Sequence, residues 1–297
     1  MNLESELAAR FPDLELRKDF IFSKHTTVGI GGRAAVAAFP RGGKALAELA
    51  AFLQRGKVPY VVIGAGSNIL VSDRGYGGLA VCTQRANSVR VDGDRVFCES
   101  GCRIRDLIFA SRESGVGGFS FLQGIPATVG GAIFMNAGAM GKYICAAVRS
   151  VTAVENGKIT VFSNEECSFS YKKTRFQKSA AVIVSAELQG AFQPPELIGE
   201  ECGRVQKLRT FLPKERSMGC IFKNPPGFFA GKLIESCGLK GSVCGGAAVS
   251  EKHANFIVNR NGASAEDFRR LIYLVKAEVL RRTGILLEEE IQYIGDF

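Results

Sequence analysis

Apolar residues recur along this chain with two different spacings, and each spacing predicts one kind of element. Spacings of three and four residues predict amphipathic helices over 2–10, 43–55, 103–113, 196–209, 230–236 and 264–282. Short apolar runs and alternation predict strands over 58–63, 148–155, 158–162, 180–188, 254–258 and 285–294. A turn at Asp92-Gly93 predicts a β-hairpin over 88–100. Helices and strands are mixed throughout, so we expect an α+β fold.

Polar and proline residues mark the ends of these elements. Ser264 precedes the longest helical pattern as a capping residue, Asp267 follows three positions later, and Gly284 ends the pattern. The break at 193–195, Gln-Pro-Pro, interrupts regular structure. We therefore expect a nucleotide-binding region up to about residue 190 and a compact C-terminal unit after it.

Two segments are rich in glycine and follow apolar runs. The first is 61–68 (VVIGAGSN), and the second is 118–141 (GFSFLQGIPATVGGAIFMNAGAMG). Glycine weakens regular elements but permits tight turns and close approach of the backbone to a ligand. Free N–H groups in such turns bind phosphate. Two such loops indicate a nucleotide with an extended pyrophosphate.

Composition narrows the functional class. The 297 residues carry a formal charge of +9, with 46% hydrophobic and 23% charged residues, as in globular proteins. The basic residues are scattered and tryptophan is absent, which favours anionic small ligands over nucleic acid. No apolar run reaches the roughly 20 residues of a membrane helix, and the N-terminus lacks the pattern of a signal peptide. We expect a cytoplasmic protein without membrane contact.

Cysteine and histidine usage does not predict a metal site. Nine cysteines form no C-x-x-C pair, and the chain has only two histidines. Cys98 and Cys102 are four residues apart, which supports zinc only weakly. We expect reduced thiols, most of them buried.

Seven motifs, two of which overlap the glycine-rich segments, occur in an order that resembles one enzyme family. They are HTTVGIGG (25–32), GAGSNILVSDRGYGG (64–78), GIPATVGGAIFMNAGA (124–139), GCIFKNP (219–225), AGKLIESCGLKG (230–241), GGAAVSEKHANFIVN (245–259) and LLEEEIQYIG (286–295). Together they resemble the UDP-N-acetylenolpyruvoylglucosamine reductases (MurB family), from about residue 20 to 295. Each motif alone would be weak, but seven in order are specific.

The resemblance implies a three-part organisation. Residues 1–80 and 81–192 would be two subdomains that bind FAD, in the vanillyl-alcohol-oxidase (PCMH) type of fold, and 193–297 would bind substrate. The chain agrees in lacking a Rossmann G-x-G-x-x-G motif, because Asn68 and Ile69 follow the first glycines. Only residues 226–229 separate FKNP from AGKLIE. This spacing resembles the short form of the family, without the inserted substrate loop.

The resemblance also implies a reaction. NADPH would reduce non-covalently bound FAD, which would then reduce the enolpyruvyl group of UDP-N-acetylglucosamine enolpyruvate to give UDP-N-acetylmuramate for peptidoglycan. The chain would thus be an FAD-dependent oxidoreductase of cell-wall biogenesis. His25 lies beside the FAD motif, but covalent flavin attachment is not expected. The oligomeric state is left open, with a monomer favoured.

Two positions match the family's catalytic residues. Cys220 stands at the Ser/Cys position of G-[SC]-x-F-K-N-P, where the family has its proton donor; without the motif, a structural cysteine would be the better interpretation. Glu290 matches the last acid of L-E-x-E and would polarise the substrate carboxyl group and enolate, an environment that raises a carboxyl pKa. From the residues alone, Glu288, Glu289 and Glu290 cannot be ranked.

The family's Tyr-Arg pair is altered here. The chain has Tyr171-Lys172-Lys173-Thr174-Arg175, so lysine occupies the arginine position, and lysine cannot form a planar bidentate fork. Either Lys172 supplies a point charge or Arg175 reaches the substrate from a shifted position. Alternation would place Arg175 on the opposite face if the segment is a strand, which favours Lys172 as catalytic and leaves Tyr171 and Arg175 as substrate-binding candidates.

The remaining candidates are carried over by motif position. For FAD they are Thr27, Gly31, Gly32, Gly64, Ala65, Gly66, Ser67, Asn68, Gly124, Ile125, Thr128, Gly130, Gly131 and Ala132, whose backbone N–H groups would hold the pyrophosphate. For the substrate they are Asn224, Lys240 and His253; a core or capping role is an equal alternative for His253. No metal is expected.

Two other functions remain open at this point. A flavin-dependent oxidase of the same FAD fold would lack the FKNP and LEEE motifs. A catalytically inactive flavin- or nucleotide-binding protein is suggested only by Lys172, and activity would eliminate it.

Overall fold

The computed structural model describes residues 3–297 and divides into two compact units. The first unit comprises Met1–Lys18, Val36–Ala65 and Gly78–Thr210, and the second comprises Asp19–Ala35, Gly66–Gly77 and Phe211–Phe297. Each unit is thus discontinuous in sequence. The predicted division at residues 80 and 192 stays a prediction.

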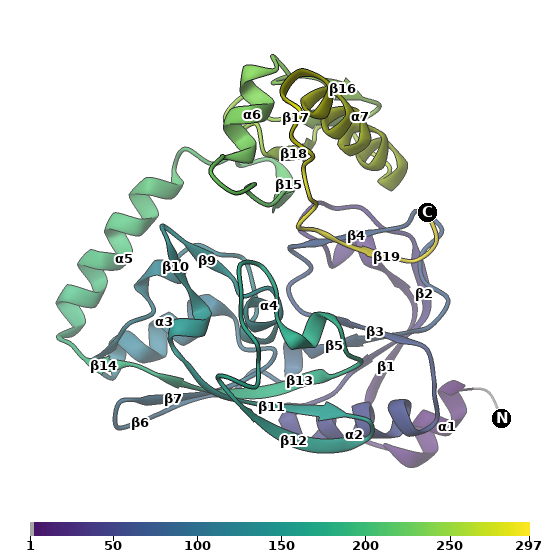
Figure 1. Ribbon diagram of the computed structural model, residues 1–297. Helices are drawn as coiled ribbons and strands as arrows, with labels where there is room; N and C mark the ends of the chain where they lie inside the picture. The colour runs from purple at the N-terminus through teal and green to yellow at the C-terminus, as the bar shows by residue number, and fades with distance from the viewer. Residues whose placement is uncertain (1–2) are drawn as a thin grey trace. The chain divides into compact units, whose positions relative to one another are not determined.

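Two sheets form the framework of the first unit (Figure 1). One is antiparallel, in the order β12 (Lys158–Ser163), β11 (Val148–Glu155), β13 (Val182–Gln189), β7 (Arg95–Glu99) and β6 (Val89–Asp92). The other has the order β1 (Glu15–Ile21), β2 (Arg33–Phe39), β5 (Leu79–Cys82) and β3 (Tyr60–Ile63), with parallel pairing of β5 to β2 and β3. The division between the units falls within β1 and β2.

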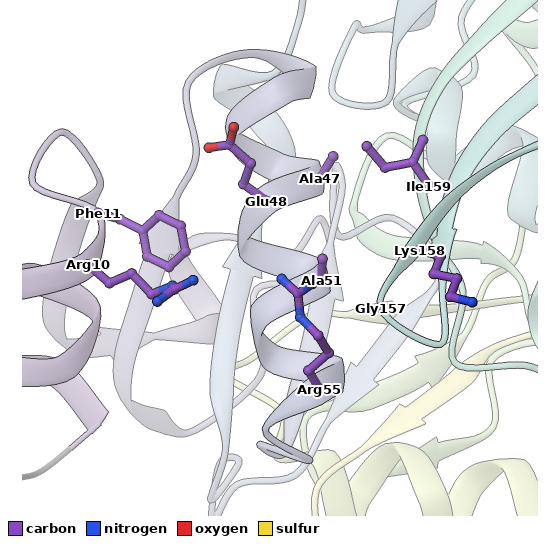
Figure 2. A pocket seen from close by; sticks show the side chains of 9 residues that line it. All are labelled: Arg10, Phe11, Ala47, Glu48, Ala51, Arg55, Gly157, Lys158 and Ile159. Atoms are coloured by element: carbon purple, nitrogen blue, oxygen red, sulfur yellow. The ribbon is translucent and has the colours of Figure 1, made fainter.

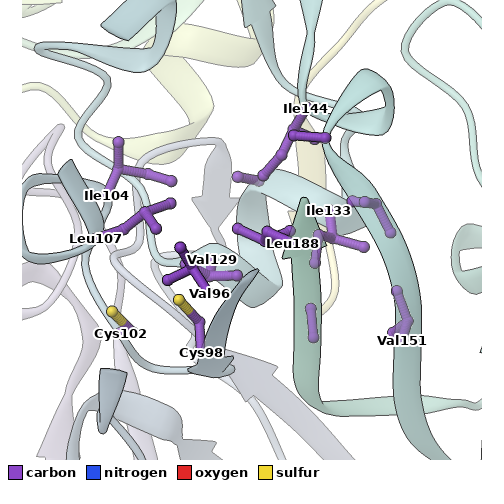
Figure 3. Close-up of a cluster of buried hydrophobic side chains, with 14 of the residues drawn as sticks. Val96, Cys98, Cys102, Ile104, Leu107, Val129, Ile133, Ile144, Val151 and Leu188 are labelled. Atoms are coloured by element: carbon purple, nitrogen blue, oxygen red, sulfur yellow. The ribbon is translucent and has the colours of Figure 1, made fainter. Parts of the chain in front are cut away.

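Helices cover the faces of these sheets. Apolar residues of α2 (Gly42–Arg55) pack with Val182 and Val184 of β13, whereas Ile183 joins a separate core. Alternate side chains of a strand point to opposite faces, so β13 contributes to two hydrophobic layers. The second layer, shown in Figure 3, includes Ile104 and Leu107 of α3 (Ile104–Glu113) and Ile133 of α4 (Val129–Phe134).

The rest of the first unit consists of short elements and two further helices. They are α1 (Leu3–Arg10), α5 (Pro195–Arg209), the pairs β8 (Val116–Gly117) with β14 (Ala191–Phe192) and β9 (Gly138–Ala139) with β10 (Lys142–Tyr143), and the 3₁₀ turns η2 (Thr83–Arg85), η3 (Ser120–Leu122), η4 (Ile144–Ala146) and η5 (Arg175–Gln177). Residue 2 of the predicted helix 2–10 lies outside the described residues.

An antiparallel sheet and two helices build most of the second unit. The sheet order is β15 (Arg216–Cys220), β18 (Phe256–Asn259), β17 (Ala247–Val249) and β16 (Val243–Cys244). Beside it lie α6 (Ala230–Ser236) and α7 (Ala265–Thr283), and the core includes Ile234, Ile257 and Phe268. A parallel pair, β4 (Ile69–Val71) with β19 (Gln292–Ile294), and η1 (Phe22–Lys24) complete the unit.

Local signals in the sequence are confirmed where they involve turns and caps. Ser264 and Asp267 form a reciprocal capping box at the start of α7, and Gly284 ends the helix with a φ of 72°. The β6–β7 hairpin turns between the paired residues Asp92 and Arg95. The β11–β12 hairpin turns at Asn156 and Gly157, and both of these residues have positive φ.

Two predicted strands are wrong in extent. The strand predicted over 254–258 is β18 (Phe256–Asn259), because the Asn255 side chain instead bonds to the backbone N–H and C=O of Phe222. The strand predicted over 285–294 is regular only at β19 (Gln292–Ile294). Its acidic part makes one isolated bridge, from Glu289 to Phe222.

Candidate active site

The first glycine segment follows β3 and has unpaired backbone donors. Within residues 3–297, the N–H groups of Ala65, Gly66, Ser67 and Asn68 donate to no protein acceptor. Gly66 has a φ of 66°, a conformation that L side chains rarely adopt. Successive N–H groups in a turn that includes a left-handed residue form an anion-binding concavity. The four amides are therefore suited to a phosphate.

Three consecutive backbone donors of the second segment are already bonded. The N–H of Val129 donates to the carbonyl of Cys102 at 2.8 Å, and that of Gly130 to the carbonyl of Ser100 at 2.9 Å. The N–H of Gly131 donates to Oγ1 of Thr128, which caps α4. The amides of Gly130 and Gly131, two of the predicted FAD residues, therefore already have acceptors within the protein.

Close packing explains the glycine content of this second segment. A Cβ on Gly130 would lie 2.0 Å from Oγ of Ser100, far inside contact distance. Gly124 has a φ of 77°, and a Cβ there would lie 2.9 Å from Nε of Arg209. Ile125 and Ala132 flank these positions, and Ala132 is buried.

The two segments approach each other within the first unit. A Cβ on Gly64 would lie 2.6 Å from Oγ1 of Thr128, so only glycine permits this approach. Nε2 of Gln84 donates to the carbonyl of Gly64 at 2.7 Å, and within residues 3–297 its buried Oε1 has no partner. An orphaned acceptor at this point fits a ligand that carries a hydrogen-bond donor.

Gln84 was not among the predicted site residues. Its position after a parallel strand could have indicated it. It lies in η2, directly after β5, a strand that pairs in parallel with β3, which leads into the first glycine segment. The carboxyl ends of adjacent parallel strands meet at one edge, where ligands commonly bind.

Three other predicted FAD residues lie in the second unit. The N–H of Thr27 donates to the carbonyl of Gly66 at 3.0 Å, and its Oγ1 donates to the carbonyl of Ser217 in β15 at 2.7 Å. Thr27 thus joins the first glycine segment to the strand that ends at Cys220. Gly31 and Gly32 pack against neighbours, since a Cβ on Gly32 would lie 2.2 Å from the carbonyl oxygen of Asp73.

The same unit brings the two principal catalytic candidates together. β15 ends at Cys220, and the carbonyl of the next residue, Ile221, accepts the N–H of Glu290 at 2.7 Å. The carbonyl of Glu290 in turn accepts Nδ2 of Asn68 at 3.1 Å. Cys220 and Glu290 are both half-buried. The backbone of Glu290 is therefore hydrogen-bonded both to the residue after Cys220 and to the side chain of Asn68 in the first glycine segment.

The three consecutive glutamates have different surroundings. Glu288 is exposed and pairs with Nζ of Lys223 at 2.6 Å. Glu289 pairs with Nζ of Lys276 at 2.6 Å and accepts the hydroxyl of Tyr293 at 2.5 Å. Burial, together with this bond, raises the pKa of Tyr293. Neighbouring glutamates thus bond to different elements.

The Tyr-Lys segment is a turn rather than a strand. Ser170 and Lys173 exchange both backbone hydrogen bonds, so Tyr171 and Lys172 form the tip, and Lys172 has a φ of 57°. Nδ2 of Asn136 holds the carbonyl of Ser170 at 2.9 Å. The argument from strand alternation was therefore wrong in its premise.

Arg175 is engaged within the first unit. Its Nη2 lies 3.0 Å from Oε2 of Glu155, and its guanidinium stacks 4.0 Å from the ring centre of Phe162. Both contacts hold Arg175 against β11 and β12. The choice between Lys172 and Arg175 for the family arginine position stays a prediction.

The three substrate candidates of the second unit have partners of their own. Oδ1 of Asn224 accepts the N–H of Ala230 at the start of α6, at 2.9 Å. Lys240 pairs with Glu235 at 2.5 Å. Burial lowers the pKa of His253, and Lys240 and Glu235 lie close enough to influence it. His253 thus lies beside both members of the Lys240–Glu235 ion pair.

Other features of the molecule carry no predicted site residue. A hollow of about 680 Å³ is lined by α1, α2 and the start of β12, including Arg10, Arg55 and Lys158 (Figure 2). Among residues 3–297 no group of three His, Cys, Asp or Glu is arranged to hold a metal ion. No helix in that range is both long and apolar enough to cross a membrane.

Comparison with known proteins decides the family. A profile described as UDP-N-acetylenolpyruvoylglucosamine reductase, C-terminal domain, matches residues 212–294, and one described as FAD binding domain matches 34–163. A UDP-N-acetylenolpyruvoylglucosamine reductase of Caldicellulosiruptor bescii is 38% identical over 99% of this chain and 96% of its own. The chain belongs to the UDP-N-acetylenolpyruvoylglucosamine reductase family.

Further relatives of this reductase family agree. The reductase of Streptococcus pneumoniae strain JJA is 34% identical over 100% of this chain and 99% of its own. The solved structure of the Thermus caldophilus reductase has a TM-score of 0.81 and 31% identity, and the match covers 95% of this chain and 99% of that one. The α+β fold, with an FAD-binding domain and the C-terminal domain of these reductases, is thereby confirmed.

The short connection between FKNP and AGKLIE, which indicated the short form of the family, is a tight turn. Residues 226–229 follow Pro225 directly, Gly227 has a φ of 77°, and the N–H of Phe228 donates to the carbonyl of Pro225 at 3.0 Å. The turn leads straight into α6, so no inserted loop stands between the FKNP motif and this helix.

Proposed function

We propose that this protein reduces the enolpyruvyl group of UDP-N-acetylglucosamine enolpyruvate with NADPH, giving UDP-N-acetylmuramate for peptidoglycan. Family membership makes it an FAD-dependent oxidoreductase. The structural observation that carries the proposal is the direct bonding of three parts within the second unit. These are Ile221, which directly follows the β15 end at Cys220, the backbone of Glu290, and Asn68 at the end of the first glycine segment.

The residues present fit FAD. The amides of Ala65–Asn68 would hold the pyrophosphate, and the orphaned Oε1 of Gln84 would accept a donor of the cofactor. Thr27 would fix the first segment through Gly66, whereas Thr128 and Gly130 would shape the second segment by packing. When bound, FAD would take a hydride from NADPH and transfer it to the substrate.

The protein's own residues would handle charge and one proton. Cys220 would donate its thiol proton to C2 of the substrate as a general acid. Glu290 would stabilise the negative charge that develops beside the substrate carboxylate. Lys172, carried over from the resemblance, would supply a cation, and Tyr171 would accompany it at the tip of the turn.

The nucleotide part of the substrate would meet the α6 region. Lys240 is a cation suited to a diphosphate, and the imidazole of His253 next to it can donate a hydrogen bond from a ring N–H. We further propose that the protein acts in the cytoplasm as a monomer. Both of its substrates are charged nucleotides, which do not cross membranes unaided.

Anaerobic spectroscopy tests the function. The purified yellow protein is bleached with NADPH, freed from excess NADPH, and mixed with UDP-N-acetylglucosamine enolpyruvate. Return of the oxidised spectrum, with UDP-N-acetylmuramate as product, is expected. Bleaching without return of the oxidised spectrum would contradict the reductase function and favour an inactive flavin-binding protein. Fast reoxidation by oxygen alone would favour an oxidase.

A pair of cysteine variants then tests the proton donor. Cys220→Ala is expected to abolish the return step while leaving bleaching by NADPH intact. Cys244→Ala is the matched control, because Cys244 is also a half-buried free thiol of the second unit. Equal rates of return in both variants would remove Cys220 from the mechanism.

A further inference from the structure

Glu289 has both carboxylate oxygens occupied by residues that were not among the site candidates. Lys276 of α7 pairs with Oε1 at 2.6 Å, and Tyr293 of β19 donates its hydroxyl to Oε2 at 2.5 Å. The side chains of Lys276 and Glu289 are only 29% and 21% exposed. The carboxylate therefore joins two elements on either side of its own segment.

The segment that carries Glu289 has little regular structure of its own. Glu289 bridges Phe222, the N–H of Lys223 donates to the carbonyl of Glu288 at 2.8 Å, and Glu290 bonds to Ile221. These bonds place the acidic segment against residues 221–223, directly after Cys220. Regular pairing begins only at Gln292, in β19.

The anchor on the other side is firm. α7 is a 19-residue helix with a capping box, and Phe268, Leu271, Ile272, Val275 and Val279 are buried in the core of the second unit. Lys276 is adjacent to one of these core residues. A side chain tied to this helix has a well-defined position.

We propose that Glu289 is a positioning residue for Glu290. Tied to Lys276 and Tyr293, it holds the acidic segment in register with residues 221–223 and so fixes the carboxyl group of Glu290 relative to the thiol of Cys220. This inference rests on the proposed function. It assigns no chemistry to Glu289, whose oxygens are already bonded, and it differs from the catalytic assignment of Glu290.

Magnitudes separate a positioning role from a stabilising one. A partly exposed ion pair contributes little to stability, and many such pairs contribute nothing measurable. A displacement of about 1 Å at a reacting group can lower a rate by about 100-fold. Loss of Glu289 is thus expected to affect one chemical step far more than the fold.

Stopped-flow measurement of the two half-reactions of the FAD-loaded protein tests the inference. Glu289→Ala is expected to slow reoxidation by UDP-N-acetylglucosamine enolpyruvate by about 10- to 100-fold. The rate of bleaching by NADPH, the FAD content and the melting temperature should stay close to the wild type. In steady state, kcat should fall more than KM rises.

Additional variants keep the test sharp. Lys276→Met and Tyr293→Phe should each slow reoxidation by less than Glu289→Ala does. Lys276→Arg should retain most of the wild-type rate. Combining Lys276→Met with Glu289→Ala should slow reoxidation little more than Glu289→Ala alone. Glu278→Ala is the matched control, because Glu278 also pairs with two cations, Arg281 and Arg282, on α7. It should leave both half-reactions unchanged.

Three outcomes would overturn the inference. One is a Glu289→Ala protein that reoxidises at the wild-type rate. Another is a parallel loss of both half-reactions and of thermal stability, which would indicate a structural role. If the wild-type protein itself fails to reoxidise with this substrate, the proposed function fails, and the inference falls with it.

Discussion

The two glycine segments resemble each other in composition but differ in what their backbones do. Ala65–Asn68 has four consecutive amides without a protein acceptor in residues 3–297, whereas the amides of Val129, Gly130 and Gly131 are all bonded within the protein. The first segment is therefore equipped to bind an anion. The second is a packed structure that shapes the region around Gly64.

The difference shows that a glycine-rich loop has two physical meanings. Glycine can free backbone donors for a ligand, or it can let two protein segments approach more closely than a Cβ allows. Gly66 serves both purposes, because a Cβ there would also clash with the backbone of His25, whereas Gly130 serves the second; both positions lie in family motifs. Variants at matched glycines can separate these two roles.

The largest effect is expected at Gly66. In Gly66→Ala, the new Cβ would lie 2.1 Å from the backbone oxygen of His25, at a φ of 66°. The left-handed conformation alone costs about 1–2 kcal/mol, and the clash must displace the loop. Flavin absorbance of the purified variant should be largely lost. Gly77→Ala is the control, because a Cβ there meets no atom within 4 Å; equal flavin content in both variants would contradict the account.

The next largest effect is expected at Gly130, where the substitution should lower the stability of the fold even without FAD. Gly130→Ala would force a methyl group against Ser100 and should destabilise the fold by about 1–3 kcal/mol, as overpacking does. Gly131→Ala should be close to neutral, since its Cβ would lie 3.4 Å from Thr128. Urea unfolding of the apoproteins measures both. If Gly130→Ala unfolds like Gly131→Ala, the second segment is not held by packing.

A smaller effect is expected at the cap of α4. Thr128→Val keeps the size of the side chain but removes the acceptor of the Gly131 amide. Loss of an N-cap costs about 0.5–2 kcal/mol, and Thr128→Ser should retain most of it. The apoprotein unfolding midpoint should therefore fall in the valine variant and not in the serine variant. Identical midpoints would show that the capping bond contributes nothing.

The smallest effect is expected at Gln84. Gln84→Met removes the bond to Gly64 and should lower apoprotein stability by about 1 kcal/mol. Because the orphaned Oε1 is also lost, FAD affinity measured by fluorescence titration should fall further than stability does. Unchanged FAD affinity would show that Gln84 has no part in binding the cofactor.

The sequence predicted those features that depend on near neighbours. The ends of α7 followed from Ser264, Asp267 and Gly284, and the β6–β7 hairpin followed from Asp92-Gly93. The family motifs selected Cys220 and Glu290, and the structure brings their segments together through Ile221. Local chemistry and motif order were sufficient for these points.

Features that depend on distant partners could not be predicted. Asn255 leaves its predicted strand because Phe222, 33 residues away, bonds to its side chain. Arg175 lies against Phe162 and Glu155, and Arg216 covers Gly29, where a Cβ would lie 2.8 Å from its Nη1. No spacing along the chain shows whether an amide in a glycine loop already has an acceptor.

Hydrogen exchange of the backbone amides, with and without FAD, tests the central contrast most directly. The amides of residues 65–68 should exchange fast in the apoprotein and slow by orders of magnitude when FAD binds, because a phosphate then accepts their hydrogen bonds. Those of residues 129–131 should be protected in both states. Unchanged exchange at 65–68, with protection gained instead at 129–131, would contradict the account.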